Sequence, residues 1–97
     1  MIVAYLSAGA RDVAAGCEEE SVPLALEMRE GSAAVLARAA ARAAPAGIGV
    51  GGDATTIVIA LATWPHPYVS APVADARVIG HAAARLAARR PLPFLVQ

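Results

Sequence analysis

Three consecutive glutamates form the densest group of side chains in this sequence that could bind a cation. Glu18, Glu19 and Glu20 fall in the last turn of a helix predicted from apolar residues between Ala10 and Cys17. The negative end of a helix dipole disfavours anions, so acids at this position need an explanation. One explanation is a solvated helix end, and the other is a cation or a basic partner bound there. The residues alone leave both open.

A divalent cation at this cluster would need ligands from another chain. Mg²⁺ and Ca²⁺ take about six or more oxygen ligands, and a run of adjacent glutamates offers about one or two with workable geometry. If a metal binds here, its site is therefore shared across an interface between two polypeptides.

Other side chains that could do chemistry lack the partners that the chemistry requires. The single Cys17 falls at an apolar helical position, where cysteine usually packs as a small hydrophobic residue. His66 and His81 have no carboxylate or cysteine nearby in the sequence at metal-ligand spacing, and we assign neither a role. The absence of lysine excludes Schiff-base and P-loop chemistry, and no serine lies in a nucleophile elbow. The sequence therefore predicts a non-catalytic protein.

The glycine-rich run Gly47–Gly52 shares its composition with dinucleotide-binding fingerprints. Such a fingerprint needs a helix after the glycines, whereas this sequence continues into the predicted strand Thr56–Leu61. The connection from Gly51 to Ala54 is too short for a crossover helix. We therefore predict an antiparallel hairpin in which glycine takes a positive φ, and turn preference explains Asp53 at its tip.

Composition limits the class of protein. The 97 residues are predicted to form one domain, residues 1–97. Eight arginines and eight acids give a formal net charge of zero, which leaves no basic stripe for nucleic acid. The longest apolar run, Ile57–Trp64, is far shorter than the about 20 residues that cross a bilayer. Met1–Leu6 has no signal-peptide character, so we expect a soluble, cytoplasmic protein.

The patterning predicts an α/β fold in three layers, α/β/α. Strands are expected at Ile2–Leu6, Val22–Met28, Ile48–Val50, Thr56–Leu61 and Leu92–Val96. Helices are expected from about Ala10 and after the N-caps Ser32 and Asp75. The prolines of Trp64–Pro72 predict a surface loop, whose aromatic residues either anchor a partner or pack on the sheet edge. The order β-α-β-α-β-β-α-β implies a five-stranded mixed, mostly parallel sheet with one antiparallel strand.

Several short motifs resemble, in the same order, the small subunit of the reactivating factors of diol and glycerol dehydratases. The most specific is the run of glycine, apolar, three glutamates, small, apolar and proline at Gly16–Pro23. The others are Ala43–Pro45 leading into Gly47–Gly49 and Asp53, Ser70–Pro72, Gly80 with Ala83–Leu86, and Pro93 with Phe94. Together these motifs span nearly the whole chain.

The resemblance implies a sheet like that of the dehydratase medium subunit and a complex with a large, chaperone-like ATPase subunit. It implies that the small subunit leaves this complex, that the medium subunit of an inactivated dehydratase takes its place, and that damaged adenosylcobalamin escapes. It also implies that Glu19 lends a ligand to a Mg²⁺ or Ca²⁺ ion of the large subunit, with Glu18 and Glu20 at the same interface. The enzyme served would use propanediol or glycerol, in the cytoplasm or in a bacterial microcompartment.

Two other functions stay open. The chain could be a shortened medium subunit of a cobalamin-dependent dehydratase, although its length leaves little beyond the core sheet for cofactor contacts. It could also be a stand-alone module that binds a small ligand at the glycine turn, and a stable monomer that binds a nucleotide would favour this.

Overall fold

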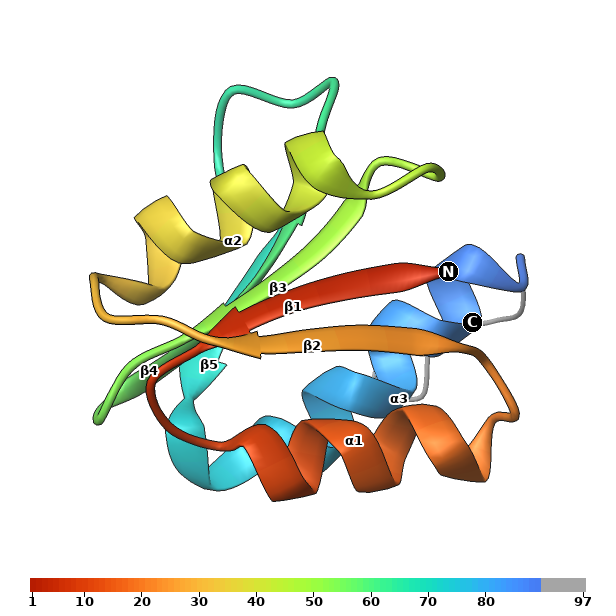
Figure 1. The fold of residues 1–97 in the computed structure, drawn as a ribbon, viewed down its shortest axis with the longest axis horizontal. Coiled ribbons are helices and arrows are strands. Elements are labelled where there is room, and N and C mark those ends of the chain that lie inside the picture. Colours follow the sequence, from red (N-terminus) through yellow and green to blue (C-terminus); the bar gives the residue numbers. More distant parts are fainter. Residues whose placement is uncertain (90–97) are drawn as a thin grey trace.

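The computed structural model describes residues 1–89 as a sheet with helices on both faces (Figure 1). The elements in chain order are β1 (Ile2–Leu6), α1 (Ala10–Glu19), β2 (Leu24–Met28), α2 (Ala33–Ala43), β3 (Ile48–Gly52), β4 (Thr56–Leu61), β5 (Val69–Pro72), the short 3₁₀ helix η1 (Val73–Asp75) and α3 (Ala76–Ala87). The strand predicted at Leu92–Val96 lies outside the described residues.

The sheet has five strands in the order β2-β1-β3-β4-β5. β1 pairs parallel with β2 and β3, and β4 pairs antiparallel with β3 and β5, so β4 alone runs against the other four. α2 covers one face, while α1 and α3 lie side by side on the other (Figure 1). The predicted three-layer fold with a mixed, mostly parallel sheet is confirmed. No helix within residues 1–89 combines the length and apolar character needed to cross a membrane.

The fifth described strand lies where the sequence predicted only a loop. β5 occupies the last four residues of the segment Trp64–Pro72, and it pairs with β4 from Val69 to Pro72. Its one proline, Pro72, is compatible with this position because β5 is an edge strand of the sheet formed within residues 1–89, where a missing backbone donor is tolerated. Before β5 the loop prediction holds, and the Trp64 and Tyr68 rings pack edge to face with centroids 5.2 Å apart.

The glycines of β3 let α2 pack directly on the strand backbone. A Cβ on Gly49 would lie 2.7 Å from the carbonyl oxygen of Ala37, and one on Gly51 would lie 2.7 Å from Ala37 Cα. The antiparallel hairpin is confirmed, but the predicted reason for its glycines is wrong. Neither Gly51 nor Gly52 has a positive φ, and both belong to the strand. Close approach of a helix, not turn geometry, requires glycine here.

Asp53 connects the β3–β4 hairpin to the start of α2. Its Oδ1 accepts hydrogen bonds from the backbone N–H groups of Thr55 and Thr56, both at 2.9 Å. Its Oδ2 accepts one from the Ala33 N–H, also at 2.9 Å. These donors stabilise the carboxylate and lower the pKa of Asp53 to about 2. Asp53 is thus a structural residue at both a turn and a helix N-terminus.

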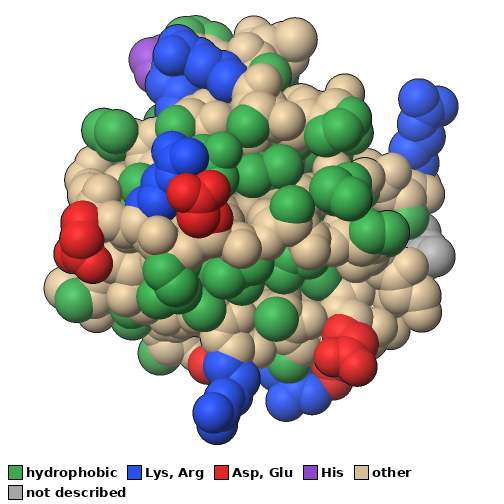
Figure 2. Space-filling model, viewed as in Figure 1, with side chains coloured by type: hydrophobic (Ala, Val, Ile, Leu, Met, Phe, Trp, Pro, Cys, Tyr) green, Lys and Arg blue, Asp and Glu red, His purple; other side chains and the backbone are tan. Residues whose placement is uncertain are grey.

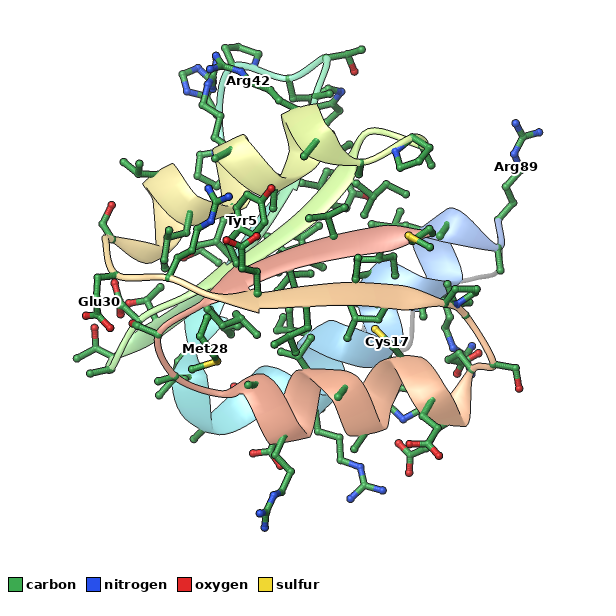
Figure 3. The ribbon with its side chains drawn as sticks, viewed as in Figure 1. Tyr5, Cys17, Met28, Glu30, Arg42 and Arg89 are labelled. Carbon is green, nitrogen blue, oxygen red and sulfur yellow. The ribbon has the colours of Figure 1, made fainter. Side chains whose placement is uncertain are left out.

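The main core lies between the sheet and the helices α1 and α3. Its largest fully buried side chains are Ile2, Leu6, Val13, Cys17, Val50, Ile57 and Ile59. Cys17 points from α1 toward the sheet (Figure 3), which confirms that it packs as a small hydrophobic residue. Burial raises the pKa of its thiol to about 11, so the thiol stays protonated at neutral pH.

Candidate functional site

The triple-glutamate segment lies where α1 crosses α3 in close contact. Glycines make this approach possible: a Cβ on Gly16 would lie 2.7 Å from the backbone nitrogen of His81, and one on Gly80 would lie 2.5 Å from the Val13 carbonyl oxygen. The Cys17 thiol donates a weak hydrogen bond to the Gly80 carbonyl oxygen at 3.5 Å. This contact sets the end of α1 beside one face of α3.

Glu20 is the buried member of the triplet and forms the C-cap of α1. It is only 8 % exposed, and its Oε2 lies 2.9 Å from His81 Nδ1 and 2.9 Å from Arg85 Nε. A buried carboxylate at the negative end of a helix is costly unless cations and hydrogen-bond donors compensate it. Arg85 and His81 supply that compensation from α3.

Glu19 is more exposed and faces the same helix. Arg77 donates to both of its carboxylate oxygens, through Nε to Oε1 at 3.1 Å and through Nη2 to Oε2. His81 Nε2 lies 2.6 Å from Oε1. The hydrogen bonds from Arg77, followed by those from His81, hold the pKa of Glu19 below its ordinary value of 4.5.

His81 bridges the two acids, because Nδ1 contacts Glu20 and Nε2 contacts Glu19. The ring therefore lies between the exposed and the buried carboxylate of the triplet. The sequence alone indicates no role for His81, whereas the structure places its ring in contact with two acids. Arg77, His81 and Arg85 recur every four residues on one face of α3, and this spacing is the signal that could have been matched to the acids.

Glu18 differs from its neighbours, since it is exposed and makes no ion pair within residues 1–89. It lies at one end of a groove between α1 and β2. Of the three predicted interface acids, Glu19 and Glu20 are therefore joined by α3, and Glu18 alone projects an uncompensated charge. The structure gives a third explanation for acids at this helix end, besides solvation and a bound cation or partner. Basic side chains of α3 in the same chain pair with Glu19 and Glu20.

The donor set fits one ligand of a shared metal site. Within the described part of the chain, no three or more His, Cys, Asp or Glu side chains are arranged to hold an ion. A carboxylate has about four acceptor positions, so Glu19 retains capacity for one more contact beside Arg77 and His81. Glu19 can thus contribute an oxygen to an ion whose other ligands come from elsewhere.

The titration of Glu19 should depend on Arg77. Arg77→Gln should raise the pKa of the Glu19 carboxyl toward 4.5, as measured by carbon NMR of that carboxyl group. Pairing with Arg77 lowers the pKa of Glu19 in the folded state relative to the unfolded state. The contribution of this pair to folding stability is therefore complete at neutral pH. It is lost as the pH falls below the pKa of the unfolded carboxyl and through that of the folded one.

Arg11→Gln is the matched control, since Arg11 is exposed on α1 and makes no ion pair within residues 1–89. It should leave the Glu19 midpoint in place. Equal midpoints in the wild type and in Arg77→Gln would show that this ion pair does not form in solution.

A second pocket lies between α2 and the loop before β5. Its volume is about 180 Å³, and its lining includes Val35, Arg38 and Trp64. Arg38 Nη1 donates to the Pro65 carbonyl oxygen at 2.7 Å, which ties the loop to the helix. Trp64 remains half exposed and packs edge to face with Tyr68. The charged or titratable side chains that line the pocket are Arg38, which is bound to the loop, and His66.

Comparisons with known proteins agree with this architecture. A chain described as "Glycerol dehydratase reactivase" superposes with a TM-score of 0.83 at 25 % identity, covering 94 % of each chain. A chain of "diol dehydratase-reactivating factor complexed with ADP and Mg2+" superposes with a TM-score of 0.78 at 27 % identity, covering 93 % of each. None of the curated proteins shows a significant match to the sequence. The family model described as "Dehydratase medium subunit" matches residues 3–93, and the chain belongs to that family.

Proposed function

We propose that this chain is the small subunit of a reactivating factor for an adenosylcobalamin-dependent diol or glycerol dehydratase. The observation that carries the proposal is the superposition on two reactivase chains over at least 93 % of each chain, with TM-scores of 0.83 and 0.78. The chain acts as an adaptor, and ATP binding and hydrolysis belong to a large partner subunit. Its place of action is the compartment that contains the dehydratase.

Subunit exchange is the proposed mode of action. The chain matches a family described as the dehydratase medium subunit, yet it superposes on reactivase chains. Two proteins with one fold can present equivalent surfaces to the same partner. The small subunit leaves the large subunit, the medium subunit of an inactivated dehydratase occupies the vacated surface, and damaged cobalamin is released.

Glu19 is the residue proposed to reach the partner's metal. One oxygen of its carboxylate would complete the coordination of a Mg²⁺ or Ca²⁺ ion held by the large subunit. Arg77 and His81 hold the carboxylate in position, and Glu20 orients His81 from the buried side. Glu18 adds negative potential at the same interface. The ion supplies charge neutralisation there, and this chain supplies a preoriented acid.

The test is coexpression of the chain with a reactivase large subunit, followed by affinity purification and metal analysis. Glu19→Gln should lose about tenfold or more in metal retained by the complex, in line with the loss of one oriented ligand. Glu30→Gln is the control: it removes an exposed acid outside the triplet, and the complex should retain the metal. Equal metal content in wild type and Glu19→Gln would remove the role of Glu19. Failure of the wild-type chain to copurify would instead contradict the subunit assignment.

The match to the medium-subunit family also supports a second candidate, a shortened medium subunit of a cobalamin-dependent dehydratase. Cobalamin absorbance in a complex formed with dehydratase subunits, and none with a reactivase large subunit, would favour it. The third hypothesis, a ligand site at the glycine turn, loses its basis. Backbone atoms of α2 cover Gly49 and Gly51, where a phosphate would have to approach.

A further inference from the structure

Within residues 1–89, no strand pairs with the outer edge of β2, and this edge is apolar. β2 is the terminal strand of the sheet, and Leu26 and Met28 on it are 37 % and 59 % exposed. Natural edge strands are usually blocked by proline, lysine or an inward charge. Leu24–Met28 contains no proline or lysine, and its single charge, Glu27, points to the opposite face from Leu26. The edge therefore lacks the usual protection against pairing.

A groove runs beside this strand, between β2 and α1. Its volume is about 520 Å³; most of its lining is apolar and includes Ala14, Cys17, Val22, Leu24 and Leu26, and Glu18 and Ser21 form its polar part. Figure 2 shows hydrophobic side chains over much of this face, with charged side chains among and around them. Met28 lies at the far end of β2 from Cys17 (Figure 3). The groove and the exposed side chains thus form one apolar strip along the edge.

The backbone of β2 shows which of its groups are free for pairing. Ile2 N–H donates to the Pro23 carbonyl oxygen, and Arg29 N–H donates to the Leu6 carbonyl oxygen, both at 3.0 Å. Since alternate residues direct their backbone groups to the same side, Pro23 and Arg29 mark the residues that face β1. Leu24, Leu26 and Met28 consequently direct their N–H and C=O groups to the open edge.

We propose that two copies of this chain associate by antiparallel pairing of their β2 strands about a twofold axis at Leu26. In this register Leu26 lies opposite its own copy, and Leu24 lies opposite Met28 of the second copy. Every outward backbone group then meets an outward group of the other strand. Met28 of each copy reaches the groove beside Leu24 of the other, which covers the apolar strip. The contact is isologous, so it closes at a dimer.

The edge at β2 offers no net charge that would attract a charged strand, so its charges favour a second copy of β2 as the partner. Glu27 and Arg29 neutralise each other, with Arg29 Nε 3.0 Å from Glu27 Oε1, and the Arg29 guanidinium lies 3.7 Å from the centroid of the Tyr5 ring. In the proposed register Glu27 lies opposite Ala25 of the other copy. Within Leu24–Met28, no like charges therefore face each other across the pair, and a neutral, apolar strand such as β2 itself is the matching occupant.

Sedimentation velocity on the isolated chain tests the dimer. The wild type should sediment with twice the 9.8 kDa monomer mass at the higher concentrations of a range of about 5 to 200 µM. Leu26→Arg should sediment as a monomer throughout, because two charges would face each other on the axis. Val35→Arg is the control: Val35 is 66 % exposed on α2, and its replacement should leave the dimer intact.

Amide hydrogen exchange gives a second measurement. It uses only the wild type, so it does not depend on whether a substituted protein folds. The Leu26 and Met28 amides should be protected at high concentration and exchange faster on dilution. A monomer at every concentration, or loss of the dimer in Val35→Arg, would overturn the proposal. Protection of these amides only in a complex with a reactivase large subunit would assign the edge to that partner and reject the second copy. Because the experiment needs this chain alone, its failure leaves the proposed function untouched.

Discussion

Gly51→Ala is expected to destabilise the fold strongly, although it adds a single methyl group. In an ordinary strand this replacement stabilises, because alanine loses less backbone entropy on folding than glycine. Here the new Cβ would lie less than 3.0 Å from the backbone nitrogen and Cα of Ala37 and from the carbonyl oxygen of Ala33. None of these atoms can rotate away, so α2 would have to lift from the sheet. We expect a loss of about 3 kcal/mol or more.

Urea denaturation followed by far-UV circular dichroism measures this effect. Ala43→Val is a suitable control, since it adds volume to α2 at an exposed position and should stay within about 0.5 kcal/mol of the wild type. A free energy of unfolding for Gly51→Ala close to that of the wild type would mean that α2 does not rest on the β3 backbone.

Gly80→Ala should separate the two helices that assemble the ion-pair cluster. In a free helix this change stabilises by about 1 kcal/mol. In this protein the added Cβ would lie 2.5 Å from the Val13 carbonyl oxygen, so α3 must move away from α1. We expect a loss of about 1 to 3 kcal/mol in the free energy of unfolding, together with weaker contacts from α3 to Glu19 and Glu20.

The free energy of unfolding and the Glu19 carboxyl titration, measured together, test this prediction. In Gly80→Ala the stability should fall and the pKa of Glu19 should rise toward its ordinary value. His81→Gln removes the bridge but leaves the glycine contact, so it should destabilise less than Gly80→Ala. If His81→Gln destabilises as much, the ion pairs and not the close crossing hold the helices together.

The sequence predicted those elements whose hydrophobic period is regular. Ile2–Leu6 and Thr56–Leu61 were predicted as strands with the bounds that the structure has, and Ser32 caps α2 as expected. β5 was missed because proline-rich composition dominated the interpretation of residues 64–72. A short edge strand needs few residues with strand character, and its pairing with β4 is a tertiary contact that local patterning does not contain.

Only the acidic half of the candidate site could be predicted from the sequence. Three adjacent acids at a helix end are visible in the sequence, but their partners lie about sixty positions further along the chain, as in the pairing of Glu20 with Arg85. The crossing of α1 over α3 depends on Gly16 and Gly80. In a sequence, a glycine within a helical pattern is first interpreted as a residue that weakens the helix, so it does not reveal a helix–helix contact. The glycines of β3 were assigned to a turn for the same reason, since the helix that covers them comes from another part of the chain.

Asp53 couples two parts of the molecule that the chain separates. One carboxylate holds the tip of the β3–β4 hairpin through Thr55 and Thr56 and the first turn of α2 through Ala33. The hairpin tip and the helix end therefore cannot fray independently, because either movement breaks bonds that the other needs. We therefore expect the hairpin tip and the first turn of α2 to open together, as one cooperative unit.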